Sequence, residues 1–466
     1  MMKPKKKGWR SLISFFLSCF LFSVFPPSSF SAVTIQQEQE LGDKVLQEIR
    51  KRWSLVQEPS ANEYINRIGN RILQNMEAQP FNYQFFILNV PEINAFAVPG
   101  GKIFVNSGLV LLAGNEDELA GVVAHEIGHI VARHIVKRSE KGQMISLATI
   151  GAILAGIFAG GKAAGAIATT TLAASQTALL KYSRDDEEEA DYLGLKFMER
   201  AGYDPLNMIT MLKKIRRMEG PAAGDPPAYL LTHPAVEERT ASLEIQMSRI
   251  PKEKELTKTS GNLQRIQTKL IVEEQGTALA VSYFENWLKR KPDDPEAFFG
   301  LGLAQKRMGG LDRAIDNFTK AAGFSPQDGE IARELGATYL LKANFPEAQK
   351  NLELARTLSP ADAMTYFYLG RLYSEQKRAD EALAAFRRAK ELDPQIPEIQ
   401  YHLAMAYGAK DMLGPAYLNF GYYYKSINDS KTALIHFNKA LAYFSENSVE
   451  RQAIQKEIQE LTPKKK

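Results

Sequence analysis

The sequence predicts a mostly helical α+β domain with a small sheet, followed by an all-α superhelix built from repeats. Two observations predict this division. Residues 83–105 have the apolar, strand-like segments and the Pro-Gly-Gly turn of a small sheet. From about residue 262 onward, prolines, alanines and aromatic residues instead recur at a step of 34 residues. A length of 466 residues leaves room for about three domains.

The first 31 residues are predicted to be a signal peptide. Five cations form its basic start: Lys3, Lys5, Lys6, Lys7 and Arg10. The apolar stretch from Leu12 to Phe25 is too short to span a membrane comfortably, and Ser29 and Ser31 are small residues of the kind that a signal peptidase needs. A lipoprotein-type cut before Cys19 is the alternative, but the apolar stretch continues past that cysteine. We therefore expect a secreted protein of the bacterial periplasm.

Charge and cysteine content fit this compartment. Subtracting the five leader cations from the net charge of +4 leaves the mature chain near −1, so the charge gives no argument for binding nucleic acid. Cys19 is the only cysteine and lies in the leader, so the mature protein would have neither a disulfide nor thiol chemistry. A chain without cysteine suits an oxidising compartment such as the periplasm.

A metal-binding helix is predicted around the motif His-Glu-Ile-Gly-His. His125 and His129 are four residues apart, so on a helix both imidazoles point from one face and can bind one metal ion. Glu126 can then polarise a water held by that ion. Asn115, followed three residues later by Glu118, is a capping-box start for this helix. Because the motif lies in an uncharged, apolar run, we expect a buried site for one Zn²⁺ per chain.

The third protein ligand is expected on a second helix. Ser183 can cap that helix, on which Glu187 and Asp191 are four residues apart and share a face. One carboxylate can bind the metal while the other orients a ligand histidine through its free N–H. His134 is the competing candidate, but it follows His129 by five residues, whereas the extended HExxHxxGxxH pattern needs six. Nothing in the sequence breaks the helix between these two histidines, so we expect His134 to be a structural or surface residue.

The chain resembles the HtpX-type zinc metallopeptidases, which are gluzincins with an HExxH helix and a glutamate third ligand in an ExxxD motif. Other blocks of that family lie between about residues 35 and 245: Glu38 to Gly42, Tyr64 to Asn66 with Gly69, Glu92 to Ala97, Gly100 and Gly101, Arg133 and His134, and Leu231 to Pro234 with Arg239. The resemblance implies a zincin fold in which His125, His129 and Glu187 are the zinc ligands. It also implies that Glu126 is the general base and that Asp191 supports a ligand histidine.

His233 has three interpretations. In relatives with C-terminal repeats, the resemblance implies that the histidine of this Thr-His-Pro block can take the fourth zinc position and hold the enzyme latent. It can otherwise help to stabilise the oxyanion, which would make it catalytic. Without the resemblance, His233 would be a loop histidine fixed by Pro234. We expect a regulatory or catalytic role.

A substrate-binding edge strand is expected just before the turn at Pro99. The resemblance implies that an edge strand beside the metal pairs with the substrate backbone. That edge consists of Asn94, Ala95, Phe96, Ala97 and Val98. Because backbone hydrogen bonds make few demands on sequence, such an edge favours unfolded or unpaired substrate segments.

Residues 144–180 are rich in Ala, Gly, Ile and Thr. The apolar part, Ile145 to Ala159, is shorter than the roughly 20 residues that a membrane span needs. We expect a pair of helices near the active site, with peripheral contact to a membrane surface. A transmembrane hairpin, as in some members of the family, is the alternative.

A tetratricopeptide superhelix is predicted for residues 262–462. The step of 34 residues is kept by prolines, alanines and glycines: Pro292, Pro326, Pro360 and Pro394, then Ala280, Ala314, Ala348, Ala382 and Ala416, then Gly302, Gly336 and Gly370. Ala433 and Phe437 repeat the spacing of Ala416 and Phe420 after only 17 residues. The helix near residues 415–426 is therefore expected to be the second member of one pair and the first member of the next.

The predicted segments are a signal peptide at 1–31, a zinc metallopeptidase domain at 32–250, a linker at 251–261, the repeats at 262–462 and a tail at 463–466. The combination of leader, peptidase block and repeats resembles periplasmic members of the family. It implies a zinc-dependent endopeptidase in the assembly and quality control of outer-membrane β-barrel proteins. Its substrates would be unfolded or stalled proteins, and the repeats would dock on the assembly machinery. The alternatives are a non-proteolytic periplasmic chaperone or adaptor with a latent or structural zinc site, and an integral-membrane peptidase.

Overall fold

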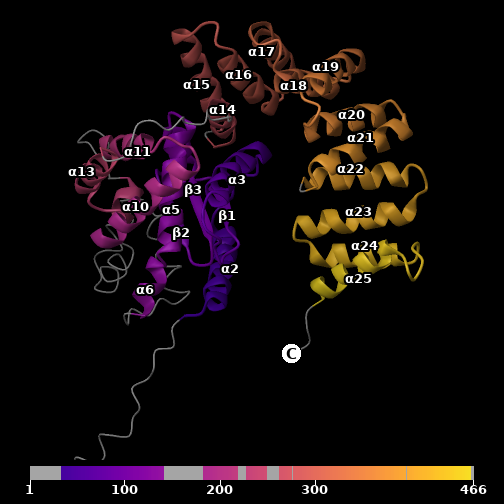
Figure 1. Ribbon diagram of the computed structural model, residues 1–466. Coiled ribbons are helices and arrows are strands. Elements are labelled where there is room, and N and C mark those ends of the chain that lie inside the picture. The colour runs from indigo at the N-terminus through magenta and orange to yellow at the C-terminus, as the bar shows by residue number, and fades with distance from the viewer. Residues whose placement is uncertain are drawn as a thin grey trace, which may run out of the picture. The chain divides into compact units, whose positions relative to one another are not determined.

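The computed structural model describes residues 33–140, 182–218, 227–248, 262–274, 276–394 and 396–462. Contacts divide the chain into two compact units: Met1–Val56 with Asn62–Ser260, and Gln57–Ala61 with Gly261–Lys466 (Figure 1). The predicted signal peptide, linker and tail, and the helices expected at 144–180, lie outside the described residues. Within the described ranges, no helix is both long and apolar enough to cross a membrane.

The first unit contains a three-stranded sheet in the order β1-β3-β2. Strand β1 (Gln84–Leu88) runs parallel to β3 (Lys102–Asn106), and β2 (Ala95–Val98) runs antiparallel to β3. The hairpin predicted across Pro99 is therefore confirmed. Because β1 and β2 lie on either side of β3, β2 is an edge strand of the sheet as described.

Helix α2 (Ile35–Arg52) packs on this sheet. It begins at a capping box in which Thr34 and Gln37 satisfy each other's backbone N–H groups. Its buried face and the sheet share one core cluster: Val45, Leu46, Ile49, Leu88, Val90, Phe96, Val98 and Phe104. Each such side chain contributes roughly 1.5–3 kcal/mol when it is fully buried, so this cluster anchors the sheet that flanks the site.

The helices with the predicted ligands are α5 (Glu116–Val131) and α10 (Arg184–Arg200), and they cross at very short range. A Cβ added at Gly128 on α5 would lie 2.8 Å from the carbonyl oxygen of Ala190 on α10. A Cβ added at Gly194 on α10 would lie 3.2 Å from the backbone nitrogen of His125. Only residues without a side chain allow this approach, which brings the two ligand-bearing helices together.

The first unit contains further helices. They are α3 (Pro59–Gln74), whose first residues are counted with the second unit, α4 (Ser107–Leu112), α6 (His134–Glu140), α11 (Leu206–Arg217), α12 (Ala228–Thr232) and α13 (Val236–Met247). Helices α10 and α11 both pack on α5, and α13 packs on α10 and α11. The expected α+β architecture, mostly helical with one small sheet, is confirmed for the described part of this unit.

The second unit consists of helices that stack in consecutive pairs (Figure 1). They are α14 (Leu263–Glu274), α15 (Thr277–Arg290), α16 (Pro295–Arg307), α17 (Leu311–Phe324), α18 (Gly329–Leu341), α19 (Phe345–Leu358), α20 (Ala363–Glu375), α21 (Ala379–Leu392), α22 (Pro397–Gly408), α23 (Leu413–Ser426), α24 (Ser430–Leu441) and α25 (Val449–Leu461). The all-α repeat architecture is confirmed for the described residues.

In several pairs, a large side chain of the second helix packs directly over a glycine of the first helix. A Cβ added at Gly302 would lie 2.5 Å from the ring of Phe318, and one added at Gly370 would lie 2.6 Å from the ring of Phe386. The same fit recurs between Gly421 on α23 and the ring of Phe437 on α24, at 2.5 Å. Because α23 also packs on α22, it belongs to two successive pairs, as the slip of half a repeat predicts.

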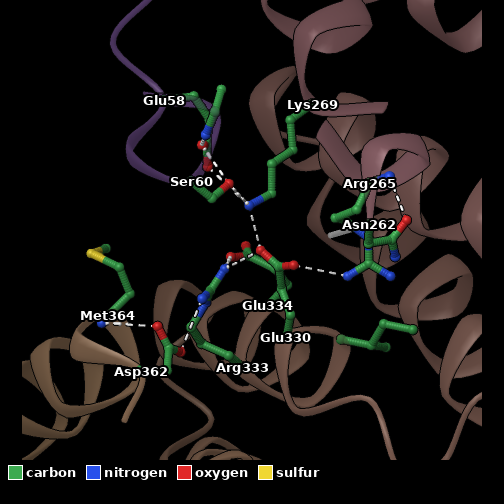
Figure 2. A network of polar contacts seen from close by, with 12 residues as sticks. Glu58, Ser60, Asn262, Arg265, Lys269, Glu330, Arg333, Glu334, Asp362 and Met364 are labelled. Atoms are coloured by element: carbon green, nitrogen blue, oxygen red, sulfur yellow. Dashed lines mark hydrogen bonds and ion pairs between the residues drawn. The ribbon is translucent and has the colours of Figure 1, made fainter. Parts of the chain in front are cut away.

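A network of charges joins the first helices of the early repeats (Figure 2). Arg265 on α14 pairs with Glu296 on α16 and with Glu330 on α18, at 2.9 Å each. Lys269, one turn further along α14, pairs with Glu330 at 2.5 Å and with Glu58 of the same unit at 2.9 Å. Removing one member of such a network deprives buried charges of a counter-ion, which is destabilising. The network therefore ties α14, α16 and α18 together.

Glu334, on the same face of α18, is held in its ionised form. Lys306 Nζ lies 2.7 Å from Glu334 Oε2, and Arg333 Nη2 lies 3.0 Å from Glu334 Oε1. Burial alone would raise the pKa of this carboxyl, but Lys306 and Arg333 lower it to about 2. The network consequently depends on a carboxylate that loses its charge only in strong acid.

Candidate metal centre

Helix α5 carries His125, Glu126 and His129 into the interior of the first unit. The helix begins at Asn115, whose side-chain oxygen accepts a hydrogen bond from the Glu118 N–H at 2.8 Å. The predicted N-cap is thus confirmed, but the full capping box does not form, because the Glu118 carboxylate accepts from the Gly114 N–H at 2.7 Å and not from that of Asn115. All three motif side chains are at most 2 % exposed, so the helix presents its polar residues to a buried site and not to solvent.

Helix α10 supplies the carboxylates. Ser183 forms a capping box with Asp186, which fixes the start of the helix one turn before Glu187. Glu187 and Asp191 are buried at 0 % and 2 % exposure, whereas the neighbouring Glu188 is exposed. The helix thus turns this i, i+4 carboxylate pair toward α5.

Four side chains from three segments converge at this point. His125, His129, Glu187 and His233 each offer one ligand atom, and these four atoms all lie within 4.8 Å of one another. The Nε2 atoms of His125 and His129 are 3.0 Å apart, and His129 Nε2 is 3.4 Å from Glu187 Oε1. His233 Nδ1 is 3.0 Å from Glu187 Oε1. Within the described ranges this is the single group of its kind, and its nitrogen and oxygen donors are those of zinc sites.

Glu126 has a buried carboxylate without a hydrogen-bond partner. Both of its carboxylate oxygens are buried, and neither accepts a hydrogen bond. An unsatisfied buried carboxylate is costly unless a ligand or water completes it. Its Oε1 lies 3.5 Å from His233 Nε2, so it borders the four-residue group, as expected for a base that acts on a bound water.

Asp191 and Arg239 support one side of the group. Asp191 Oδ1 lies 2.8 Å from Nδ1 of His125, so it directs the other ring nitrogen of that histidine toward the centre. Arg239 on α13, 2 % exposed, pairs with Asp191 at 2.7 Å and with Glu187 at 2.5 Å. Burial alone would raise the pKa of Asp191, but Arg239 lowers it to about 2. Sequence reasoning named Arg239 only as part of a family block and missed this contact.

The buried charges set the protonation of the group. Burial raises the pKa of Glu126, which favours proton uptake, and burial lowers the pKa of His129, which keeps its imidazole neutral. Burial would also raise the pKa of Glu187, but Arg239 and His233 hold it well below its usual value. A neutral imidazole and an ionised carboxylate are the forms that bind a metal ion.

The structure corrects the expectation for His134. Helix α5 ends at Val131, Arg133 has a left-handed φ of 54°, and a new helix, α6, begins at His134. The expected uninterrupted helix is therefore wrong. His134 is 1 % exposed and does not lie at the surface. Its Nδ1 lies 2.8 Å from Nδ1 of His129, although His134 is not among the four converging ligands.

The predicted substrate edge lies beside α5 but is covered. Ala95 to Val98 form β2, which packs against α5, and all four residues are buried. Asn94 is also fully buried, and neither atom of its side-chain amide has a hydrogen-bond partner. The backbone N–H of Tyr229 on α12 donates to the carbonyl of Ile93 at 3.1 Å. The segment that ends in His233 is thus fastened to the start of this edge.

Comparison with known proteins accounts for both units. Residues 59–246 match the sequence profile of Peptidase family M48. These residues are an M48 peptidase domain. Residues 272–329 and 363–396 match profiles of the tetratricopeptide repeat. The M48 family implies a bound metal, and the group of three histidines and a glutamate supplies donors that fit one.

The relatives of the M48 domain are named as proteases. The beta-barrel assembly-enhancing protease of Escherichia coli (strain K12) is 35% identical over 218 residues, which are 46% of this chain and 44% of that protein. A putative beta-barrel assembly-enhancing protease of Vibrio cholerae is 35% identical over 212 residues, 45% of this chain and 44% of that protein. The mitochondrial metalloendopeptidase OMA1 of Schizosaccharomyces pombe is 29% identical over 218 residues, 46% of this chain and 62% of that protein. The chain thus covers less than half the length of the two bacterial relatives.

Proposed function

We propose that this protein is a zinc-dependent endopeptidase of the bacterial periplasm that acts in the assembly and quality control of outer-membrane β-barrel proteins. The observation that carries the proposal is the convergence of His125, His129 and Glu187 beside the unsatisfied carboxylate of Glu126. The M48 domain supports the reaction class. The names of the bacterial relatives support the process, and the leader-like first 31 residues support the compartment.

The chemistry follows from the position of each side chain. His125, His129 and Glu187 would hold the zinc ion, which would supply Lewis-acid activation of a water by lowering the pKa of that water toward about 7. Glu126 accepts a proton from that water as it attacks the peptide carbonyl, and then donates a proton to the leaving amine. Burial raises the pKa of Glu126, which favours proton uptake by this carboxylate, the first of the two steps. Asp191, through His125, holds the ligand orientation throughout.

Substrate selection is proposed to rest on the backbone of residues 94–98. Strand β2 lies at the edge of the sheet and packs on the helix that bears the histidines. An extended chain that pairs with this edge would lie along α5, with its peptide groups next to Glu126. Since pairing needs free backbone N–H and C=O groups, unfolded or stalled proteins would be taken in preference to folded ones.

His233 is proposed to hold the enzyme latent. Its Nδ1 lies with the other three ligand atoms, and a site with four protein ligands leaves no open position for water. Its backbone N–H donates to the carbonyl of Tyr229, whose own N–H donates to Ile93. Catalysis would therefore require that the segment ending in His233 leave both the ligand group and the start of β2.

The presence of four protein ligand atoms, His233 included, also favours a second candidate, a chaperone or adaptor with a permanently closed structural zinc site. Degradation of unfolded casein separates the two. The parent and Glu188→Gln, which changes an exposed acid on α10, should degrade casein equally, and Glu126→Gln should abolish degradation. Because a latent parent would degrade casein slowly, Glu126→Gln is also compared in the His233→Ala background. Equal rates with and without Glu126 in both backgrounds would defeat the peptidase proposal.

The role of His233 is tested in the same assay. A faster reaction of His233→Ala than of the parent, with zinc still bound, would support latency. A loss of activity with retained zinc would instead assign His233 to stabilisation of the oxyanion, and the latency proposal would be wrong.

A further inference from the structure

A chain of three polar side chains leads from the ligand group to the surface of α10. Nδ1 of His129 lies 2.8 Å from Nδ1 of His134, and Nε2 of His134 lies 3.1 Å from Oε2 of Glu189. His134 is 1 % exposed, whereas the side chain of Glu189 is 49 % exposed. Among these three residues only His129 belongs to the converging ligands, and the peptidase mechanism above does not use the other two.

The two contacts admit one arrangement of protons on neutral rings. His129 directs Nε2 toward the other ligand atoms, so its single proton must be on Nδ1 when Nε2 binds a metal. That N–H donates to Nδ1 of His134, which must therefore be unprotonated. The proton of His134 is then on Nε2, where it donates to the carboxylate of Glu189. Any other pair of neutral tautomers would place two N–H groups or two lone pairs against each other in one of these contacts.

The backbone between the two histidines is shaped for this contact. Arg133 adopts a left-handed φ of 54°, which ends α5 and starts α6 at His134. Arg133 Nε donates to Glu38 at 3.0 Å, and its Nη2 donates to the carbonyl of Val33 at 2.8 Å. A non-glycine residue in this region costs free energy, so the surrounding contacts must hold it there. On an uninterrupted helix, residues five apart would not face each other.

We propose that His134 is a positioning residue for the metal ligand His129, and that Glu189 anchors it. The two ligand histidines of α5 would then be oriented from opposite sides. Asp191 orients His125 by direct contact at 2.8 Å, and Glu189 orients His129 through His134. This inference rests on the proposed metal site and adds a residue to it that has no ligand role of its own.

The test compares zinc affinity, measured by competition with a chromophoric chelator, for two substitutions at one position. His134→Leu removes the acceptor for the His129 N–H, and loss of such support typically weakens metal binding about 10–100-fold. His134→Asn places an amide oxygen near the former Nδ1, so it should retain zinc affinity within about threefold of the parent. Lys137→Ala is the matched control, because Lys137 pairs with the exposed carboxylate of Glu189 at 3.7 Å but is not one of the three side chains that lead from the ligand group to the surface.

The outcomes are separable. Equal zinc affinity of the Leu and Asn variants would overturn the inference, since a purely structural histidine would lower the melting temperature without this difference. If His134→Leu does not fold, His134→Gln replaces it, because the longer amide reaches the Nε2 position and not Nδ1. A parent protein that binds no zinc would instead defeat the proposed function itself.

Discussion

Gly128→Ala is the smallest change that separates the two ligand-bearing helices. Gly128 precedes His129 on α5, where the helix crosses α10. The added methyl carbon would lie 2.8 Å from the carbonyl oxygen of Ala190 and 3.1 Å from its Cα. An ordinary contact is about 3.4 Å or more, so the backbone of α10 must retreat by roughly 0.6 Å. Ala190 lies between Glu187 and Asp191 on that helix.

The magnitude follows from two opposing effects. Overpacking at a close contact costs about 1–3 kcal/mol, while alanine favours a helix over glycine by about 1 kcal/mol. The net loss of stability should therefore be at most about 2 kcal/mol, and the variant should fold. Zinc affinity should fall more steeply, by about tenfold or more, because metal–ligand distances tolerate only about 0.2 Å.

Zinc competition and thermal melts of the full chain measure both quantities. Gly323→Ala is the matched control, since a Cβ added at Gly323 on α17 meets nothing within 4 Å; it should leave zinc affinity unchanged and stability equal or slightly higher. Parent-like zinc affinity of Gly128→Ala would refute the idea that this crossing sets the distance between Glu187 and the histidines.

Three further substitutions probe the counter-ion of the site, the charged network and the repeat core. Arg239→Leu leaves two buried carboxylates without their cation, so the metal-free protein should lose about 3–5 kcal/mol, and zinc should restore more stability to it than to the parent. Equal losses with and without zinc in thermal melts would contradict this. The pKa of Glu334 is lowered from 4.5 to about 2, so the ionised side chain contributes up to about 3 kcal/mol to the free energy of unfolding. This contribution is present above pH 4.5 and disappears as the pH falls toward 2. In urea unfolding, the free energy of unfolding of Glu334→Gln should fall less than that of the parent between pH 4.5 and pH 2. The same pH dependence in both proteins would contradict this. Phe318→Ala, at a fully buried ring, should cost about 3–5 kcal/mol in urea unfolding, whereas Phe324→Ala, at a ring 50 % exposed, should cost less than about 1; similar losses would contradict the proposed repeat packing.

Much of the fold could be predicted because its signals are local or periodic. The spacing of His125 and His129 on a capped helix, and of Glu187 and Asp191 on another, needs only helical geometry. The step of 34 residues and its half-repeat slip likewise follow from the positions of small and aromatic residues, and α23 shows the double packing that the slip predicts.

What could not be predicted depends on contacts between distant segments or on unusual backbone angles. Arg239 reaches Asp191 across 48 residues of sequence, and no local pattern marks that pairing. Arg133 has the left-handed φ that brings His134 beside His129, but an arginine is not the glycine or asparagine that usually marks such an angle in a sequence. The charges of Arg265 and Lys269 would have been assigned to a solvated face, because their partners lie on later helices.

The metal content of the purified full chain tests the central claim most directly. Elemental analysis of the parent protein and of Glu187→Ala, each purified without chelator, should find about one zinc per parent chain and much less in the variant. A parent protein without bound metal, or equal zinc in both proteins, would contradict the proposed site on α5 and α10.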